Sequence, residues 1–278
     1  MSAVGGLSEL VARALAEDLG AVGDITSALL PPGLAGEASL VPRAEGVLAG
    51  RAAAAEVFAQ VDPAIGVDWR ADDGDRVVAG TAFARVEGPL ASILTAERTA
   101  LNFLGHLSGI ASLTSRYVEA VAGTGAAIRD TRKTTPGLRA LEKYAVRCGG
   151  GDSHRADLAA AVLIKDNHLA ALDGDVRRAV SAARDAAPPG TIVEVECDTL
   201  DQVHAAAEAG ADIILLDNMP PAVMGDAVSL VAGRALTEAS GGISLQTVRA
   251  IAATGVDRIS IGALTHSAGA LDVGLDAD

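Results

Sequence analysis

The sequence predicts an α/β protein in which a parallel sheet or β/α barrel follows a smaller α+β unit. Two observations carry this prediction. From Ile128 onward, short apolar runs that end in polar residues alternate with Ala-rich helical patterns, which is typical of parallel strands joined by helices. Half of the 278 residues are hydrophobic but only 2% are aromatic, so the core is expected to consist mainly of Ala, Val, Leu and Ile.

The first hundred residues contain the shorter segments of the α+β unit. They predict strands over residues 37–41 and 81–86, a helix over 51–60 and a turn at Asp73-Gly74. A helix over residues 96–121 is expected to join the two parts, because apolar residues recur in it at helical spacing and glycines follow it.

The rest of the chain predicts six buried strands with helices between them. The strands are expected over residues 126–130, 161–166, 192–198, 213–218, 234–238 and 258–260. Two of the helices are expected over residues 199–209 and 245–254. Polar groups close these strands, and active-site groups of a barrel gather at the C-terminal strand ends.

The overall charge excludes several partners. A formal charge of −14 repels both nucleic acid and anionic membranes.

Cys148 and Cys197 stand outside any Cys-x-x-Cys pattern, so no disulfide or zinc site is predicted and both are expected to be reduced. Residues 1–24 lack the features of a secretory signal, and the longest uncharged stretch, residues 99–115, is too short to span a membrane. We expect a soluble, cytoplasmic protein.

One segment reverses this negative charge. Between Arg129 and Lys165, eight Lys and Arg side chains stand against four acids. His154 and the three glycines 149–151 lie in the same stretch. In an acidic chain, this cluster indicates a local pocket for a small ligand that carries several negative charges.

The strand ends in and after this segment supply both cations and carboxylates. Guanidinium groups such as Arg132 and Arg155 bind carboxylates through two parallel hydrogen bonds, whereas Lys133 and Lys165 act as point charges. Glu194 and Asp217 are candidates to bind magnesium, often through water, or sugar hydroxyls. Because Glu196 follows Glu194 by two residues, it faces the same side of its strand, either as a ligand or as the partner of a lysine. The combination suits an anionic acid together with a metal-chelated phosphate ester.

Two glycine-containing loops are candidates for phosphate binding. Ser240-Gly241-Gly242 and Gly262 precede helices late in the predicted barrel, where backbone N–H groups commonly bind phosphate. Each loop alone is also compatible with a plain turn. His106 and His204 are expected to be surface or packing residues on helices, His266 can cap the last junction, and glycines 149–151 either end a helix or line a ligand site.

Several stretches together resemble one family over nearly the whole chain, the quinolinate phosphoribosyltransferases, which are type II phosphoribosyltransferases also called decarboxylating nicotinate-nucleotide pyrophosphorylases. The stretches are EDLGAVGDITS from Glu17, AERTALNFLGHLSGIAS from Ala96, DTRKTTPGLRALEKYAVRCGGG from Asp130, HRADLAAAVLIKDNH from His154, VEVECDT from Val193, ILLDNM from Ile214, EASGGI from Glu238 and RISIGALTHS from Arg258.

The resemblance implies a fold, a reaction and an assembly. The fold is an incomplete β/α (TIM-like) barrel over residues 107–266, with a smaller N-terminal open α/β sandwich domain over 1–106 on which the tail 267–278 packs. The reaction joins quinolinate to phosphoribosyl pyrophosphate with magnesium, and it yields nicotinate mononucleotide, pyrophosphate and CO2 during NAD synthesis. The assembly is a homodimer in which Arg98 completes the partner's quinolinate site.

The resemblance also assigns residues. The quinolinate contacts are Arg98, Arg132, His154, Arg155 and Lys165. The side that binds phosphoribosyl pyrophosphate and metal comprises Lys133, Glu194, Asp217, Ser240, Gly241, Gly242, Gly262 and His266. Within these sets, catalytic roles are expected for Lys133, Lys165, Glu194 and Asp217, and metal binding for Glu194 and Asp217.

Three positions depart from the family pattern, and three other functions compete. Asp157 and Ala160 stand where the family usually has Gly and Asp, and Ser153 where it often has Asn, so the loop that supports His154 and Arg155 is altered. The competing functions are a paralogous branch associated with molybdenum transport operons, a Schiff-base aldolase that would use Lys165, and a non-catalytic anion-binding protein. The complete set of charged residues favours the quinolinate enzyme.

Overall fold

The computed structural model describes residues 5–277, which form two compact units. One unit consists of residues 1–115, 134–150 and 264–278, and the other of residues 116–133 and 151–263. The first is called the N-terminal unit and the second the barrel unit. The domain limits expected from the sequence, 1–106 and 107–266, stay a prediction.

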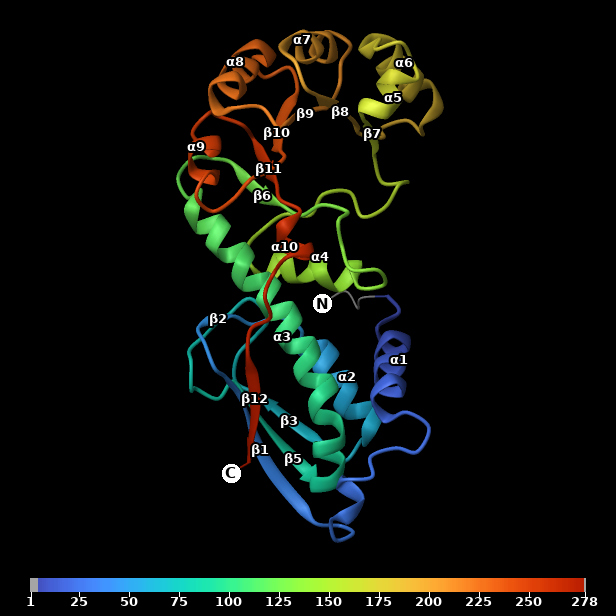
Figure 1. Cartoon of the computed structure of the whole chain (residues 1–278), viewed down its shortest axis with the longest axis vertical. Coiled ribbons are helices and arrows are strands. Elements are labelled where there is room, and N and C mark those ends of the chain that lie inside the picture. The colour runs from blue at the N-terminus through green and yellow to red at the C-terminus, as the bar shows by residue number, and fades with distance from the viewer. Residues whose placement is uncertain (1–4, 278) are drawn as a thin grey trace. The chain divides into compact units, whose positions relative to one another are not determined.

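The N-terminal unit is built on an antiparallel sheet with the strand order β12-β1-β5-β3. Its strands are β1 (Ala35–Pro42), β3 (Gly66–Trp69), β5 (Ala84–Pro89) and β12 (Val273–Ala277). A second, two-stranded sheet pairs β2 (Gly46–Val47) with β4 (Arg76–Val77). The C-terminal strand β12 lies beside β1 from Ala38 to Pro42, so the end of the chain completes a sheet begun near its start (Figure 1).

Helices accompany this sheet. They are α1 (Leu7–Leu19), the 3-10 helix η1 (Ser27–Leu29), α2 (Arg51–Val61), α3 (Leu90–Ala120), α4 (Arg139–Cys148) and α10 (Ala263–His266). Along α3, Ile93, Ala100, Leu104 and Leu107 recur at helical spacing and are buried, which explains why this segment forms one long amphipathic helix.

Glycines let the chain pack closely against α3. A Cβ at Gly109 would collide with the backbone of Gly269, and one at Gly149 would collide with the backbone of Ala111. Gly149 directly follows α4 as its C-cap. Close packing therefore accounts for Gly149, which favours the structural interpretation of that glycine over a ligand-binding one.

The barrel unit is built on a parallel six-stranded sheet with the order β6-β11-β10-β9-β8-β7. Its strands are β6 (Ala127–Arg129), β7 (Val162–Ile164), β8 (Val193–Cys197), β9 (Ile213–Asp217), β10 (Leu236–Ser240) and β11 (Arg258–Ser260). The edge strands β6 and β7 do not pair with each other within residues 5–277, and the edge of β6 is instead met by a single bridge to Asp152. The fold is an incomplete barrel, as predicted.

Helices connect successive strands of this sheet. They are α5 (Asp166–Ala170), α6 (Val176–Ala186), α7 (Leu200–Glu208), α8 (Pro221–Val231) and α9 (Val248–Ala252). Helices α6, α7 and α8 lie side by side along the sheet (Figure 1). Their starts follow from local chemistry, since Asp175 caps α6, Thr199 and Gln202 form a capping box on α7, and Pro221 occupies the first turn of α8.

Two aspartates make the same kind of hydrogen bond at the N-terminal ends of the parallel strands. Asp212 precedes β9, and its carboxylate accepts a 2.7 Å hydrogen bond from the backbone N–H of Val193 at the start of β8. Asp257 precedes β11, and its carboxylate accepts a 2.7 Å hydrogen bond from the backbone N–H of Thr237 in β10. The short sequences Gly-Ala-Asp and Gly-Val-Asp at these positions thus fix the alignment of neighbouring strands.

The predicted elements are confirmed in type and order. All six strands of the barrel unit fall within or next to their expected ranges, and the helix expected over residues 96–121 is α3, which begins earlier, at Leu90. Among residues 5–277, no helix combines the length and apolar character that crossing a membrane requires.

Removal of the Asp257 carboxylate tests whether its hydrogen bond to the next strand stabilises the sheet. The substitution Asp257→Ala leaves the N–H of the buried Thr237 without its acceptor, so we expect the free energy of unfolding to fall by about 1–2 kcal/mol in urea denaturation. The control Asp226→Ala removes an exposed acid from α8 and should change the free energy of unfolding by less than about 0.5 kcal/mol. Equal effects of the two substitutions would contradict the assigned role.

Candidate functional site

A pocket of about 560 Å³ lies at the C-terminal ends of the barrel strands. Every strand of the sheet contributes to its wall directly or through the loop that follows it. The lining residues are Thr131, Arg132, Lys133, His154, Arg155, Leu163, Lys165, Glu196, Leu215, Asp217, Asn218, Ser240, Gly241, Gly242 and Ser260. All belong to the barrel unit.

The alternation of side chains along each strand arranges this wall in two layers. Successive residues of a strand point to opposite faces, so residues two apart share a side. In β8 these are Glu194 and Glu196, and in β10 they are Glu238 and Ser240. Glu196 and Ser240 belong to the layer that lines the pocket, while Glu194 and Glu238 lie deeper and are almost completely buried.

Two arginines on this wall are arranged to receive an anion. Burial, and next the nearby charge of Arg132, lower the pKa of the Arg155 guanidinium, which remains charged at neutral pH. The Nε atoms of Arg132 and Arg155 are buried without a hydrogen-bond partner. Two like charges with unused donors favour a ligand that carries at least two negative charges.

The lysines of the wall differ in their surroundings. Lys165 forms an ion pair with Glu196, which confirms the interpretation of Glu196 as a lysine partner. A lysine that is already paired with a carboxylate suits charge pairing with an anion better than the nucleophilic role that Schiff-base chemistry requires. Lys133 is exposed at the pocket, and its backbone N–H donates to the Thr131 hydroxyl.

The loop Ser240-Gly241-Gly242 joins the pocket from the end of β10. Gly241 has φ +94° and Gly242 has φ +59°, which are backbone conformations that glycine adopts without strain. A Cβ at Gly241 would collide with the side chain of Asn218, whereas a Cβ at Gly242 meets open space. Asn218 itself has φ 52° and donates its backbone N–H to the carbonyl of Ser240. The ends of β9 and β10 thus form one close-packed, glycine-dependent corner.

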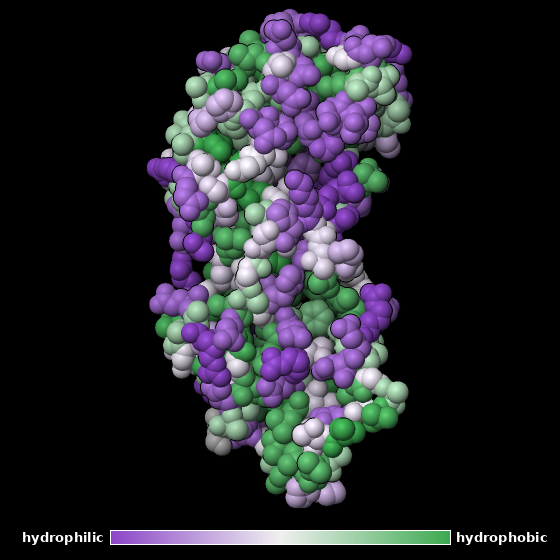
Figure 2. Space-filling model, viewed as in Figure 1, coloured by the Kyte–Doolittle hydropathy of each residue, from purple (hydrophilic) through white to green (hydrophobic). Residues whose placement is uncertain are grey.

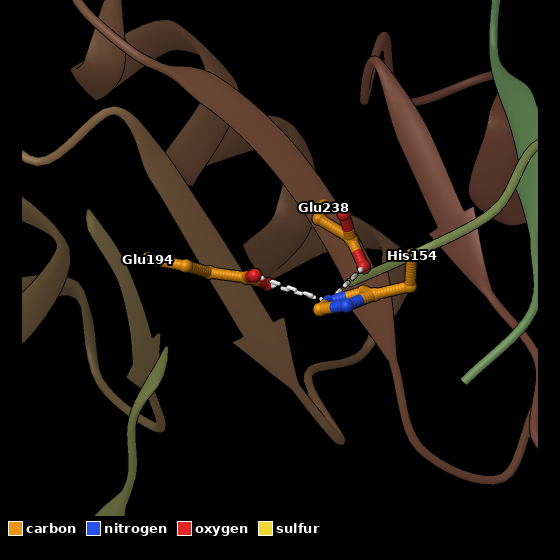
Figure 3. A group of neighbouring side chains, drawn as sticks. All are labelled: His154, Glu194 and Glu238. Atoms are coloured by element: carbon orange, nitrogen blue, oxygen red, sulfur yellow. Dashed lines mark hydrogen bonds and ion pairs between the residues drawn. The ribbon is translucent and has the colours of Figure 1, made fainter. Parts of the chain in front are cut away.

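Beneath the pocket lies a buried cluster of His154, Glu194 and Glu238, whose side chains point toward one another (Figure 3). The Nε2 atom of His154 is 3.0 Å from Glu194 and 3.5 Å from Glu238. The other ring nitrogen, Nδ1, accepts a 2.8 Å hydrogen bond from the backbone N–H of Arg155. Because Nδ1 accepts, this geometry favours an imidazole whose proton is on Nε2 and is donated to the carboxylates.

The pocket brings together most of the residues predicted from the sequence. Nine of them line it: Arg132, Lys133, His154, Arg155, Lys165, Asp217, Ser240, Gly241 and Gly242. Glu194 lies in the cluster beneath, and Gly262 belongs to the barrel unit outside the lining set. Arg98 and His266 belong to the N-terminal unit, where Arg98 is exposed and His266 contacts Ser267. Their expected roles stay predictions.

The sequence analysis missed six residues that line the pocket or lie beneath it: Thr131, Leu163, Leu215, Asn218, Glu238 and Ser260. Glu238 and Ser260 face the interior of the barrel, and Asn218 packs on Gly241. Glu238 and Ser260 close predicted strands, but the sequence does not show that β10 and β11 pair and bring these two side chains into contact. The signal for Asn218 was absent, because its role depends on a left-handed backbone conformation.

The residues fit a magnesium ion only in part. Asp217 lines the pocket and accepts a hydrogen bond from the Asn218 side chain, so it offers a carboxylate of the kind that binds magnesium together with substrate phosphates. Glu194 shares its buried position with a histidine and a second carboxylate. A donor set that includes nitrogen does not favour magnesium, and the metal role expected for Glu194 stays a prediction.

The fold and the pocket are typical of a β/α-barrel enzyme that binds a small polyanion at the C-terminal ends of its strands. Two family models match the chain, the quinolinate phosphoribosyl transferase N-terminal domain over residues 24–108 and its C-terminal domain over residues 110–276. The chain belongs to the quinolinate phosphoribosyltransferase family.

Individual relatives agree with the family models. The nicotinate-nucleotide pyrophosphorylase (carboxylating) of Mycobacterium leprae is 47% identical over 96% of this chain and 96% of its own length. The probable enzyme of the same name from Bacillus subtilis is 43% identical over 97% of this chain and 93% of its own length. The solved structure of the nicotinate-nucleotide pyrophosphorylase from Francisella tularensis has a TM-score of 0.94 at 40% identity, and the match covers 100% of this chain and 98% of that one.

The glycine corner can be tested by substitution. Gly241→Ala combines a φ of +94° with a collision at Asn218, so we expect the affinity for pyrophosphate in titration calorimetry to fall about 10-fold or more. Gly242→Ala introduces a methyl group into open space at a similar backbone conformation and should have a smaller effect. If the two variants bind pyrophosphate equally well, packing on Asn218 does not shape the site.

Proposed function

We propose that this chain transfers the phosphoribosyl group of phosphoribosyl pyrophosphate to quinolinate with decarboxylation. The products are nicotinate mononucleotide, pyrophosphate and CO2, formed during de novo NAD biosynthesis. The observation that carries the proposal is one pocket in an acidic chain that gathers Arg132, Lys133, Arg155 and Lys165. The names of the relatives support this reaction, and the paralogous branch associated with molybdenum operons is not favoured.

The arginine side of the pocket suits quinolinate. Quinolinate carries two adjacent carboxylates, which the overall field of an acidic protein repels. Arg132 and Arg155 stand close enough for one charge to affect the other, and their Nε donors lack partners in the structure of the chain alone. Two guanidinium forks offer the bidentate donors that two carboxylates require, and Lys165 adds a third charge.

Other residues of the pocket suit phosphoribosyl pyrophosphate. The Ser240-Gly241-Gly242 loop brings bare backbone to the wall, and Lys133 supplies a charge for a phosphate group. We propose that magnesium binds here through Asp217 and substrate oxygens, with Glu194 too deeply buried to reach them directly. Bound magnesium would neutralise charge on the leaving pyrophosphate.

The chain's own residues have two tasks in this reaction, positioning and charge compensation. Displacement of pyrophosphate by the ring nitrogen develops positive charge on the ribose, which the carboxylate of Asp217 can stabilise. After transfer, the pyridinium ring accepts the electrons left by loss of the neighbouring carboxylate as CO2. No covalent nucleophile is needed, and the ion-paired state of Lys165 agrees with a binding role.

We further propose a cytoplasmic homodimer in which Arg98 reaches the pocket of the partner. Arg98 has a side chain that is 65% exposed and belongs to the N-terminal unit. Large hydrophobic side chains are exposed around η1 and at the starts of β1 and α3, where Figure 2 shows apolar surface: Val22, Ile25, Leu29, Leu34 and Leu94. Exposed apolar side chains on the same unit as an exposed arginine support contact with a second copy.

Substrate selectivity tests the reaction. With phosphoribosyl pyrophosphate and magnesium present, we expect nicotinate mononucleotide from quinolinate, and none from nicotinic acid or nicotinamide, measured by chromatography. Arg155→Ala should lower kcat/KM for quinolinate by about 100-fold, because a buried charge-assisted pair is lost. The control Arg177→Ala removes an exposed arginine of α6 and should leave kcat/KM unchanged. Product from nicotinic acid would assign a different transferase.

A mixing experiment tests the shared site. We expect Arg98→Ala and Lys165→Ala each to lose more than about 90% of the activity as homodimers, since each removes a charge from every site. Mixed dimers contain one site with both residues intact, so mixing should restore up to about a quarter of the activity if subunits exchange randomly. Subunit exchange is verified with differently tagged chains. No recovery after verified exchange would refute the contribution of Arg98 to the partner's site.

A further inference from the structure

Glu238 is a buried carboxylate that uses both of its oxygens. It lies in the middle of β10 with no exposed surface. One oxygen accepts a 2.5 Å hydrogen bond from the Arg129 guanidinium in β6. The other accepts a hydrogen bond from the Ser260 hydroxyl in β11 and lies 3.5 Å from His154 Nε2. A buried carboxylate is costly unless it is paired, and these contacts supply the pairing.

The same contacts reach the pocket through His154. His154 lines the pocket, and its backbone N–H donates to Asp130, which follows β6. Its ring is held between the backbone of Arg155 on one side and the two carboxylates on the other. Arg129 also donates to the backbone carbonyl of Ser153, the residue before His154. Glu238 therefore holds both the ring of His154 and, through Arg129, the chain that leads to it.

We propose that Glu238 is a positioning residue for the pocket. Its carboxylate fixes His154 in the orientation and tautomer that direct Nε2–H toward Glu194, and it anchors the loop that carries Arg155. Glu238 is absent from the lining residues of the pocket, so it acts through His154 and Arg129 and has no direct contact with substrate. Only the expected effect of Glu238 on kcat rests on the proposed reaction. The expected orientation of the His154 ring does not.

The surrounding charges disfavour a metal ion as the purpose of this cluster. The ligand atoms of His154, Glu194 and Glu238 lie near enough to one another to hold an ion. However, Arg129 and Ser260 already bind the two oxygens of Glu238, and the guanidinium compensates one of the two carboxylate charges. A divalent cation would have to displace these donors beside an existing positive charge.

Nitrogen NMR of the histidine rings tests the proposal without substrate. The chain has five histidines, so His154 can be assigned by substitution in protein labelled with 15N-histidine. In the parent protein we expect protonated Nε2 and unprotonated Nδ1. Glu238→Gln should shift the Nε2 resonance or populate a second tautomer. It should also lower kcat for quinolinate on the order of 10-fold while KM changes less, as is typical when a residue that orients a site residue is removed.

Glu142→Gln is a matched control, since Glu142 is also buried and hydrogen-bonded to a histidine, His106, in the N-terminal unit. It should alter the signals of His106 and leave those of His154 unchanged.

If Glu238→Gln does not fold, Ser260→Ala removes one partner of the same carboxylate and should shift Nε2 of His154 in a folded protein. Unchanged His154 nitrogens in the folded variant, or a protonated Nδ1 in the parent, would overturn the proposal. A parent protein that fails to turn over quinolinate would refute the proposed reaction, while the ring signals would still judge the role of Glu238.

Discussion

The two-residue alternation of the parallel strands is the constraint on which the site depends. Because every second residue faces the barrel interior, a strand of five residues can place one polar group at the pocket wall and another one layer below it. Strand β8 does this with Glu196 and Glu194, and β10 does it with Ser240 and Glu238. A shift of β8 by one residue would exchange its carboxylates for Val or Cys side chains, and a shift of β10 would exchange Glu238 for Thr237 or Ala239. The acceptors at Asp212 and Asp257, which secure the strand starts, therefore also protect the site.

The layered arrangement resolves a conflict between binding an anion and remaining stable. Several cations around one pocket repel one another until a ligand arrives, and the pKa of Arg155 is lowered first by burial and next by the charge of Arg132. The structure offsets this repulsion with carboxylates placed near the cations, Glu196 at Lys165 and Glu194 near Arg155. The Nε donors of Arg132 and Arg155 remain unused. Positive charge is thus compensated at the rear of the site and left available toward the ligand.

The sequence was sufficient for the fold and for the pocket wall, for different reasons. The strands were recognisable because buried apolar runs end in polar residues, and the long helix α3 because its apolar residues keep helical spacing. The cationic wall was recognisable because its members stand out in an acidic chain. Glu194 of the deeper layer was also predicted, but Glu238 was not, since in the run from Leu236 to Ser240 it looks like one more polar strand end. Only the pairing of β10 with β11 places Ser260 beside it.

The buried layer beneath the pocket also affects which substitutions the loop that carries His154 and Arg155 can accept. The resemblance implies that three positions of the loop around His154 and Arg155 depart from the family pattern, namely Ser153, Asp157 and Ala160. Asp157 accepts hydrogen bonds from the backbone N–H groups of residues 159 and 160, so the loop forms its own local turn. The carbonyl of Ser153 binds Arg129, a contact that any residue at this position can make with its backbone. Because the contacts of Arg129 and Glu238 reach this loop through the backbone of Ser153 and the His154 ring, we expect the loop to keep the orientation of its two site residues when the side chains at these three positions change.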